Sequence, residues 1–236
     1  DGQRANHYVD GIEIMKAKKE KSTDDAAKLA ADKLILSLYD QMAACYPKEI
    51  GYALSRKAFD MFYMPSYGYS AETAAAFKNA IEKAGNSAEY IILEPIGLVV
   101  NYMFKNNLMT QADARFLVEK SQEIADFNIS NNEKYGQYYE ASYARMEVPL
   151  AEVEGQIFDC DYFKAKLVPA YQENPEDLAT IRYTFNKLKT QGCADTDPIM
   201  VELKTKYEAK AANMNAAMQE DFLAKNPGMA ARKFYE

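Results

Sequence analysis

The sequence lacks several residues that common classes of protein require. It contains no tryptophan and a single histidine, His7, among 236 residues. Any mechanism that needs two or more histidines is therefore excluded. Glycine occurs only 10 times and proline 8 times, which argues against a β-sandwich with many turns and against a disordered chain.

Neither an excess of basic residues nor a long apolar segment is present. The chain has 28 Lys and Arg against 35 Asp and Glu, a net charge of −7, so we expect no nucleic-acid partner. The longest apolar runs, 90–93 and 96–100, are separated by Glu94 and Pro95 and fall short of the roughly 18 residues of a membrane span. We expect no membrane span. Because the chain begins at Asp1 without a methionine, we expect it to be a trimmed or processed product. The absence of a signal peptide from such a product does not show that the protein is not exported.

What the sequence does contain is helical periodicity. Apolar residues recur at intervals of three and four over most of the chain, and no segment alternates convincingly as a strand would. Short loops between consecutive helices favour antiparallel neighbours. The sequence therefore predicts an all-α fold of about ten helices in a single domain over residues 1–236. The polar segment 128–132 is a candidate subdivision, and a long C-terminal helix is expected over 198–225.

Several helix ends are predicted from capping patterns. Serine, threonine, asparagine and aspartate side chains accept hydrogen bonds from the first free amides of a helix, and proline is favoured at the first helical position. The candidates are Ser22 with Asp25, Ser70, Ser87, Thr110 with Asp113, Asn174 with Pro175, Asp197 with Pro198, and the terminating Asn226-Pro227-Gly228.

Serial helical hairpins are also typical of tetratricopeptide repeats, which have 34 residues and two helices each. Two segments match the second-helix pattern: residues 167–171 followed by Asn174-Pro175, and residues 77–81 followed by Gly85. The tryptophan-containing signature of the first helix is absent. Because packed helical bundles show the same alternation of small and large residues, the pattern leaves a repeat array and a bundle open.

Three stretches of the sequence together resemble a known group of proteins. They are His7-Tyr-Val-Asp-Gly11 with Leu38-Tyr39-Asp40-Gln41; Val153-Glu154 to Phe158 with Cys160; and Phe163 to Pro169 with Asn174-Pro175-Glu-Asp-Leu178, Lys187-Leu188 and Gly192-Cys193. These resemble exported tetratricopeptide-like proteins of unassigned role from Gram-negative gut anaerobes, over about residues 7–208. The resemblance implies a right-handed superhelix of antiparallel hairpins in the periplasm or cell envelope, and it supplies no catalytic residues. After about residue 208, a continuous helix stands where further repeats are expected.

Cys160 and Cys193 are candidates for a disulfide. They bracket two helical segments, and in an antiparallel hairpin the start of the first helix lies beside the end of the second. The resemblance to exported proteins favours the bond; the alternative is two unpaired, partly buried thiols. We expect Cys45, just before Pro47, to be a lone core thiol, because nothing in the spacing supports a catalytic pair with His7.

Four tyrosines form a second candidate site: Tyr135, Tyr138, Tyr139 and Tyr143. On a helix, they share one face. Such a stripe could line a concave groove that stacks on sugar rings or holds a peptide. The alternative is packing between helices, with the hydroxyl groups at the rim.

Acidic residues flank the two cysteines, and we expect them to cap helix starts, where carboxylates are favoured. They are Asp159, Asp161, Asp195 and Asp197. The pattern of a calcium loop is absent, as are phosphate-binding glycine loops, nucleophile elbows and the H-E-x-x-H motif. We therefore expect no metal site, no cofactor and no catalytic residues.

The last predicted helix carries a long apolar stripe at intervals of three and four residues. One interpretation is a capping helix that closes the hydrophobic core. The other is a docking face for another protein or for a second copy of the chain, because methionine-rich faces adapt to partners. The stripe consists of Met200, Leu203, Tyr207, Met214, Met218 and Phe222, with Ala211 between the third and the fourth.

These features predict a non-catalytic scaffold of the cell envelope that presents a concave helical face to a protein or peptide. The main alternative is a helical-repeat protein that binds carbohydrate. The third possible function is that of an enzyme. Exposure of the predicted tyrosine stripe, Tyr135 to Tyr143, in a groove would favour the carbohydrate ligand, and complete burial of these tyrosines would argue against it.

Overall fold

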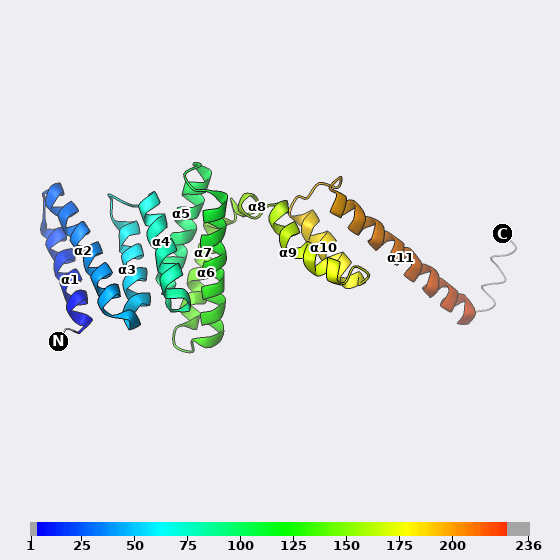
Figure 1. The fold of residues 1–236 in the computed structure, drawn as a ribbon, viewed down its shortest axis with the longest axis horizontal. Helices are drawn as coiled ribbons and strands as arrows, with labels where there is room; N and C mark the ends of the chain where they lie inside the picture. Colours follow the sequence, from blue (N-terminus) through cyan, green and yellow to red (C-terminus); the bar gives the residue numbers. More distant parts are fainter. Residues whose placement is uncertain (1–3, 226–236) are drawn as a thin grey trace. The chain divides into compact units, whose positions relative to one another are not determined.

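The computed structural model describes residues 4–225, apart from the side chains of residues 219 and 223. Within that range it contains eleven α-helices and no strand, which confirms the all-α prediction. The chain forms two compact units, Asp1–Ile157 and Phe158–Glu236 (Figure 1). No helix in the described range is both long enough and apolar enough to cross a membrane.

The described part of the first unit, from residue 4 on, contains eight α-helices. Consecutive long helices run in opposite directions (Figure 1), and α7 packs against both α5 and α6. Short 3-10 turns lie at Pro47–Glu49, Gly85–Ser87 and Tyr90–Ile92. The helices are α1 (Asn6–Lys21), α2 (Asp25–Cys45), α3 (Ile50–Tyr63), α4 (Ala71–Ala84), α5 (Leu93–Lys105), α6 (Gln111–Asn131), α7 (Gly136–Leu150) and α8 (Glu154–Ile157).

Glycine allows α5 and α7 to approach closely. A Cβ atom placed on Gly97 of α5 would lie 2.6 Å from the carbonyl oxygen of Met146 in α7 and 3.0 Å from its Cα. Both neighbouring atoms belong to the backbone, so they cannot move aside as a flexible side chain would. The neighbouring residues Ile96, Val99 and Val100 are fully buried, and the missing side chain at Gly97 thus sets the spacing of these two helices.

The second unit contains α9 (Cys160–Glu173), α10 (Leu178–Thr190) and α11 (Pro198–Lys225). α10 packs against both of the other helices. Tyr171, Ile181, Leu188 and the N-terminal part of α11 supply its hydrophobic core, together with Cys193. The core therefore occupies only one end of the 28-residue α11.

Four of the predicted caps are present. Ser70 and Thr110 accept hydrogen bonds from the amides of the third residue after them. Asp159 accepts one from the Tyr162 amide, and Asp197 accepts one from the Ile199 amide with Pro198 at the first position of α11. These helix starts are local interactions, which explains why the sequence alone predicts them.

Three other predicted helix starts are wrong. α2 begins at Asp25, capped by Asp24 and not by Ser22, and α10 begins at Leu178, capped by Asp177 and not by Asn174. In both, a nearby aspartate adds negative charge at the positive end of the helix. Ser87 lies in a 3-10 turn, and α5 begins only at Leu93. The predicted terminator Asn226-Pro227-Gly228 lies outside the described residues.

The polar segment 128–132 does not divide the chain. α6 continues to Asn131, and the buried Asn128 amide donates hydrogen bonds to the carbonyl oxygens of Asn86 and Ile124. The polar side chain thus holds this segment to the rest of the first unit, and the boundary between the units falls after Ile157.

Candidate binding surface

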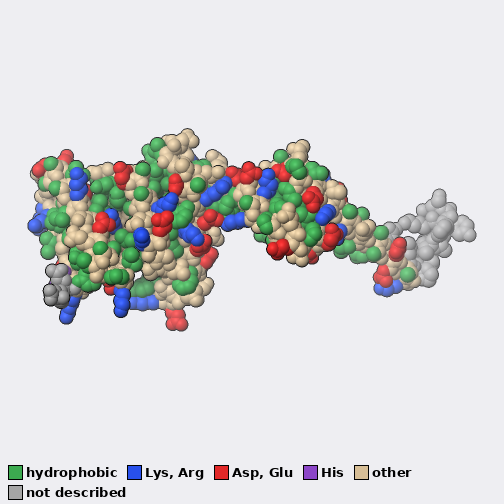
Figure 2. Space-filling view, in the orientation of Figure 1, with side chains coloured by type: hydrophobic (Ala, Val, Ile, Leu, Met, Phe, Trp, Pro, Cys, Tyr) green, Lys and Arg blue, Asp and Glu red, His purple; other side chains and the backbone are tan. Residues whose placement is uncertain are grey.

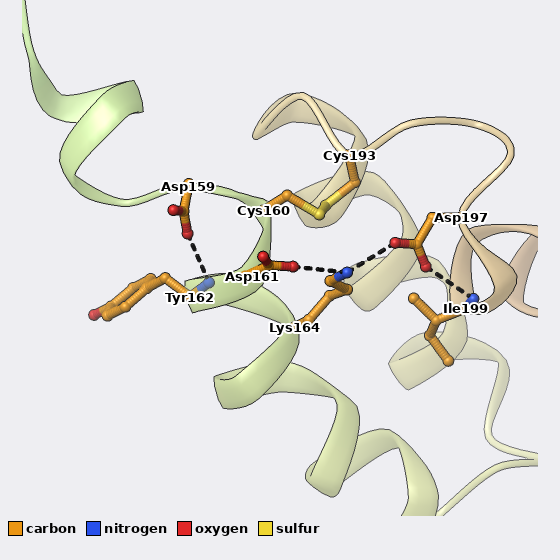
Figure 3. The surroundings of a disulfide bond; sticks show 8 residues. All are labelled: Asp159, Cys160, Asp161, Tyr162, Lys164, Cys193, Asp197 and Ile199. Carbon is orange, nitrogen blue, oxygen red and sulfur yellow. Dashed lines mark hydrogen bonds and ion pairs between the residues drawn. A yellow bond between two sulfur atoms is a disulfide. The ribbon is translucent and has the colours of Figure 1, made fainter.

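The structure joins Cys160 and Cys193 by a disulfide, with their Cα atoms 5.0 Å apart. Cys160 begins α9 and Cys193 follows α10, so the bond links the start of one helix of the hairpin to the end of the other. Figure 3 shows Lys164 beside this bond, where its ammonium pairs with both Asp161 and Asp197 at 2.8 Å. The disulfide and the ion pairs together tie all three helices of the second unit.

The charges near the disulfide perturb one another. The hydrogen bond from Lys164 lowers the pKa of Asp197 from its usual value. The pKa of Lys164 is raised by its hydrogen bonds to two carboxylates, with the larger effect from Asp161 and the smaller from Asp197. Asp161 supplies a negative charge in the first turn of α9, and Asp197 caps α11. The described residues contain no group of three or more acidic, histidine or cysteine side chains arranged to hold a metal.

The prediction that Cys45 is a core thiol is wrong. Cys45 is exposed and outside any disulfide, and the Tyr8 hydroxyl contacts its Sγ at 3.6 Å. It is the last residue of α2, three residues after the buried Met42. Because the helix ends there, no further turn covers the thiol.

The structure separates the four tyrosines predicted to share one face. Tyr139 is buried and donates a hydrogen bond to the carbonyl oxygen of Ala88 at 2.7 Å. Tyr143 is half-buried, whereas Tyr135 and Tyr138 are exposed. Burial, with a contribution from Glu89, raises the pKa of Tyr139 to about 12. Tyr139 thus packs inside the first unit, Tyr143 is partly covered, and of the four only Tyr135 and Tyr138 are exposed.

We expect Tyr139→Phe to lower the free energy of unfolding by about 1.5 kcal/mol, because it leaves the buried Ala88 carbonyl without this donor. Urea unfolding followed by circular dichroism measures the change. Tyr138→Phe is the matched control, since it removes an exposed hydroxyl and should change stability by less than about 0.5 kcal/mol. Equal effects of the two variants would contradict the structural role of Tyr139.

A different set of tyrosines forms an exposed group of interacting rings in the first unit. We call Tyr63, Tyr69 and Tyr102 the tyrosine surface; their exposed fractions are 62%, 43% and 45%. The buried Phe62 ring lies 4.9 Å from Tyr63 and 5.3 Å from Tyr69, and Tyr69 lies 4.7 Å from Tyr102, between ring centroids. The rings therefore form one continuous aromatic group.

Two helix ends and one loop position the tyrosine surface. Tyr63 is the last residue of α3, and Tyr102 lies in the last turn of α5. The loop between α3 and α4 is anchored by the buried Met64 and turns at Gly68, which has a φ of +47° that suits glycine. The loops that follow α3 and α5 lie at the same end of the first unit, at the top in Figure 1.

Two pockets lie near the tyrosine surface. Tyr63 lines a pocket of about 380 Å³ whose rim holds Lys16 and Asp60, an ion pair at 2.8 Å. Met103, next to Tyr102 in the chain, lines a second pocket of about 330 Å³ with the exposed Leu108. The ion pair of Lys78 and Asp113, at 2.9 Å, also lines this pocket. Each pocket thus combines apolar side chains with one ion pair. Figure 2 shows hydrophobic side chains among the charged ones at this end of the unit.

The sequence contains little that would identify the tyrosine surface. Tyr63 and Tyr69 are near each other in the chain, but Tyr102 is more than thirty residues away. No helical interval relates them, because they come from two helix ends and a loop. The one local indication is a tyrosine at or near the end of each of two apolar helical segments.

The predicted stripe of the last helix divides into two parts. Met200 and Leu203 are buried in the core of the second unit, and Tyr207 packs against it. Met214, Met218 and Phe222 are exposed. The first part closes the hydrophobic core, and the second part is exposed beyond it.

Comparisons of this chain with protein-family models, with curated proteins and with solved structures gave no match.

Proposed function

We propose that the protein is a non-catalytic scaffold of the cell envelope and that it binds a protein or peptide through the tyrosine surface. The observation that carries the proposal is the unbroken series of ring contacts that joins the exposed Tyr63, through the buried Phe62, to the exposed Tyr69 and Tyr102. Tyrosine is enriched in protein interfaces because its large, rigid ring buries much area at little cost in conformational entropy. Exposed tyrosines held by their neighbours are therefore suited to recognition.

The dimensions favour an extended segment of a partner. From Tyr63 through Phe62 and Tyr69 to Tyr102, the ring centroids are each about 5 Å apart, so the path is at most about 15 Å, or four to five extended residues. A partner side chain at one end would meet the ion pair of Lys16 and Asp60, and one at the other end would meet Leu108 and the ion pair of Lys78 and Asp113. This arrangement suits a short peptide with polar or charged groups at both ends.

Two features support a tetratricopeptide-like scaffold in an exported protein. Consecutive helices of the first unit form antiparallel pairs, and Phe77 and Ala80 of the repeat-like segment are fully buried, as the large and small residues of a hairpin contact should be. The disulfide of the second unit is typical of oxidising compartments such as the periplasm. The proposal therefore includes a right-handed superhelix and a location in the envelope.

Selection of peptides from a displayed random library against the oxidised full chain tests the proposal. We expect the selected peptides to bind at least about 30-fold more weakly when Tyr63, Tyr69 and Tyr102 are all replaced by alanine, because aromatic anchors dominate binding energies. The matched control replaces three other exposed tyrosines, Tyr135, Tyr138 and Tyr183, and should keep the affinity within about threefold. Peptides that bind both variants equally would contradict the proposal.

A carbohydrate ligand is the second candidate, and one observation favours it. Tyr138 stacks on Tyr90 with ring centroids 5.3 Å apart and nearly parallel planes, and the exposed Tyr135 lies beside Tyr138. Exposed ring faces of this kind can stack on sugars. Binding on a glycan array that is lost in Tyr138→Ala, with no peptide selected, would favour this candidate over the first.

A further inference from the structure

α11 is much longer than the helix against which it packs. It has 28 residues, against 13 in α10, so it extends about 42 Å compared with about 20 Å. Met200 and Leu203 are buried, but every described side chain from Ala212 to Lys225 is exposed. Hydrophobic side chains remain visible on this far part of the helix in Figure 2.

The exposed part continues the face of α11 that packs against α10. Successive residues of the stripe are three, four and four positions apart, which adds up to eleven residues. This pattern occurs twice, from Met200 to Ala211 and from Ala211 to Phe222. Eleven residues over three turns keep a stripe on one side of a nearly straight helix. Met214, Met218 and Phe222, with exposed fractions of 52%, 68% and 52%, therefore extend a core-forming face beyond the core.

We propose that this face pairs with the same helix of a second copy of the chain, in antiparallel orientation. The axis of the pair lies near residues 215–216, so that Met214 of each copy packs against the partner's Met218. Ala211 on the stripe and Ala217 at its edge have small side chains, which allow two helices to approach, and methionine adapts its shape to the opposite surface.

The charge distribution along α11 favours the antiparallel orientation. Lys210 is the only charged residue from 209 to 219, and Glu220 and Asp221 follow. Lys210, four residues before Met214, and Asp221, three residues after Met218, lie on the same edge of the stripe. An antiparallel pair places each Lys210 near the partner's Asp221, whereas a parallel pair in register places like charges at the same level.

The charges remain accessible to a second chain. Lys210 pairs with Glu176 and Asp221 pairs with Lys225, both within one copy. The Asp221 side chain is nevertheless largely exposed, and Lys210 lies at the margin of the covered region. The complementary charges would orient the two helices, and the methionines and Phe222 would supply the buried area.

Light scattering and sedimentation of the oxidised full chain, from about 1 to 200 μM, test the proposal. The expected mass at high concentration is that of two chains. Met214→Glu with Met218→Glu should reduce it to one chain, a loss of affinity of at least about 100-fold, because four carboxylates would meet in the apolar interface. The control, Ala212→Glu with Ala216→Glu, adds the same charge at the same spacing on the opposite face and should remain a dimer.

Cross-linking tests the orientation. In a Cys45→Ser background, Ala211→Cys and Phe222→Cys proteins are mixed, one carrying a mass tag, and treated with a short bis-maleimide. The antiparallel pair predicts links between unlike variants. The proposal would be overturned if the unaltered protein had the mass of a single chain at every concentration. That result would also be obtained if another part of the same chain covered the stripe. A dimer that survives the two glutamates, or links mainly between like variants, would overturn the proposal as well.

Discussion

Replacing Cys160 and Cys193 together by serine is expected to lower the free energy of unfolding of the second unit by roughly 3–4 kcal/mol. The two residues are separated by 33 positions, and closing a loop of that length restricts the unfolded chain by about this amount. The effect is large relative to the stability of a small unit. The core of this unit involves only one side each of three helices, so few other contacts compensate for the loss.

Urea unfolding of oxidised and reduced protein and of the double serine variant measures this effect. The variant should unfold at the same urea concentration as the reduced protein, and both well below the oxidised protein. Cys45→Ser is the control, because that thiol is exposed and outside the disulfide, and its effect should be below about 0.5 kcal/mol. Free thiols at both Cys160 and Cys193 in oxidised protein, detected by non-reducing peptide mapping, would contradict the prediction.

Gly97→Ala is expected to destabilise the first unit by about 3 kcal/mol, although alanine is the better helix former. In an open helix, alanine would stabilise by up to about 1 kcal/mol relative to glycine. At position 97, however, the added Cβ would lie 2.6 Å from the Met146 carbonyl oxygen. α5 and α7 would have to move apart, which disturbs the packing of the fully buried Ile96, Val99 and Val100.

Thermal unfolding followed by circular dichroism measures this change, with an expected fall in the midpoint of roughly 8 °C. Gly155→Ala is the matched control, because an added Cβ on this glycine of α8 meets no atom within 4 Å. It should be neutral or slightly stabilising. A neutral Gly97→Ala variant would show that these two helices do not approach as closely as the structure places them.

Local patterns predicted those features of the protein that depend on neighbours in the chain. Ser70, Thr110, Asp159 and Asp197 cap helices as predicted, because each cap joins residues two or three positions apart. Where two local candidates compete, as Asn174 and Asp177 do before α10, the pattern alone did not choose between them. Asp177 immediately precedes α10 and accepts a hydrogen bond from the Thr180 amide, and its negative charge is favoured at the positive end of the helix.

Features that depend on packing between helices were predicted less well. The spacing of Tyr135, Tyr138, Tyr139 and Tyr143 indicates one helical face, yet Tyr135 precedes α7 and Tyr139 is buried against Ala88. Cys45 has an apolar neighbourhood in sequence but lies at an uncovered helix end. In both cases, exposure depends on where the neighbouring helices end, which periodicity does not specify.

The sequence by itself determined that this chain is helical, where most of its helices lie and which face of each is apolar, because these follow from intervals of three and four residues and from local caps. Only the tertiary structure decided which apolar faces are covered. It buries Met200 and Leu203 but leaves Met214, Met218 and Phe222 exposed on the same stripe, and it brings Tyr63, Tyr69 and Tyr102 together from separate segments. The physical reason is that burial depends on the length and position of neighbouring helices, whereas periodicity depends only on the helix itself.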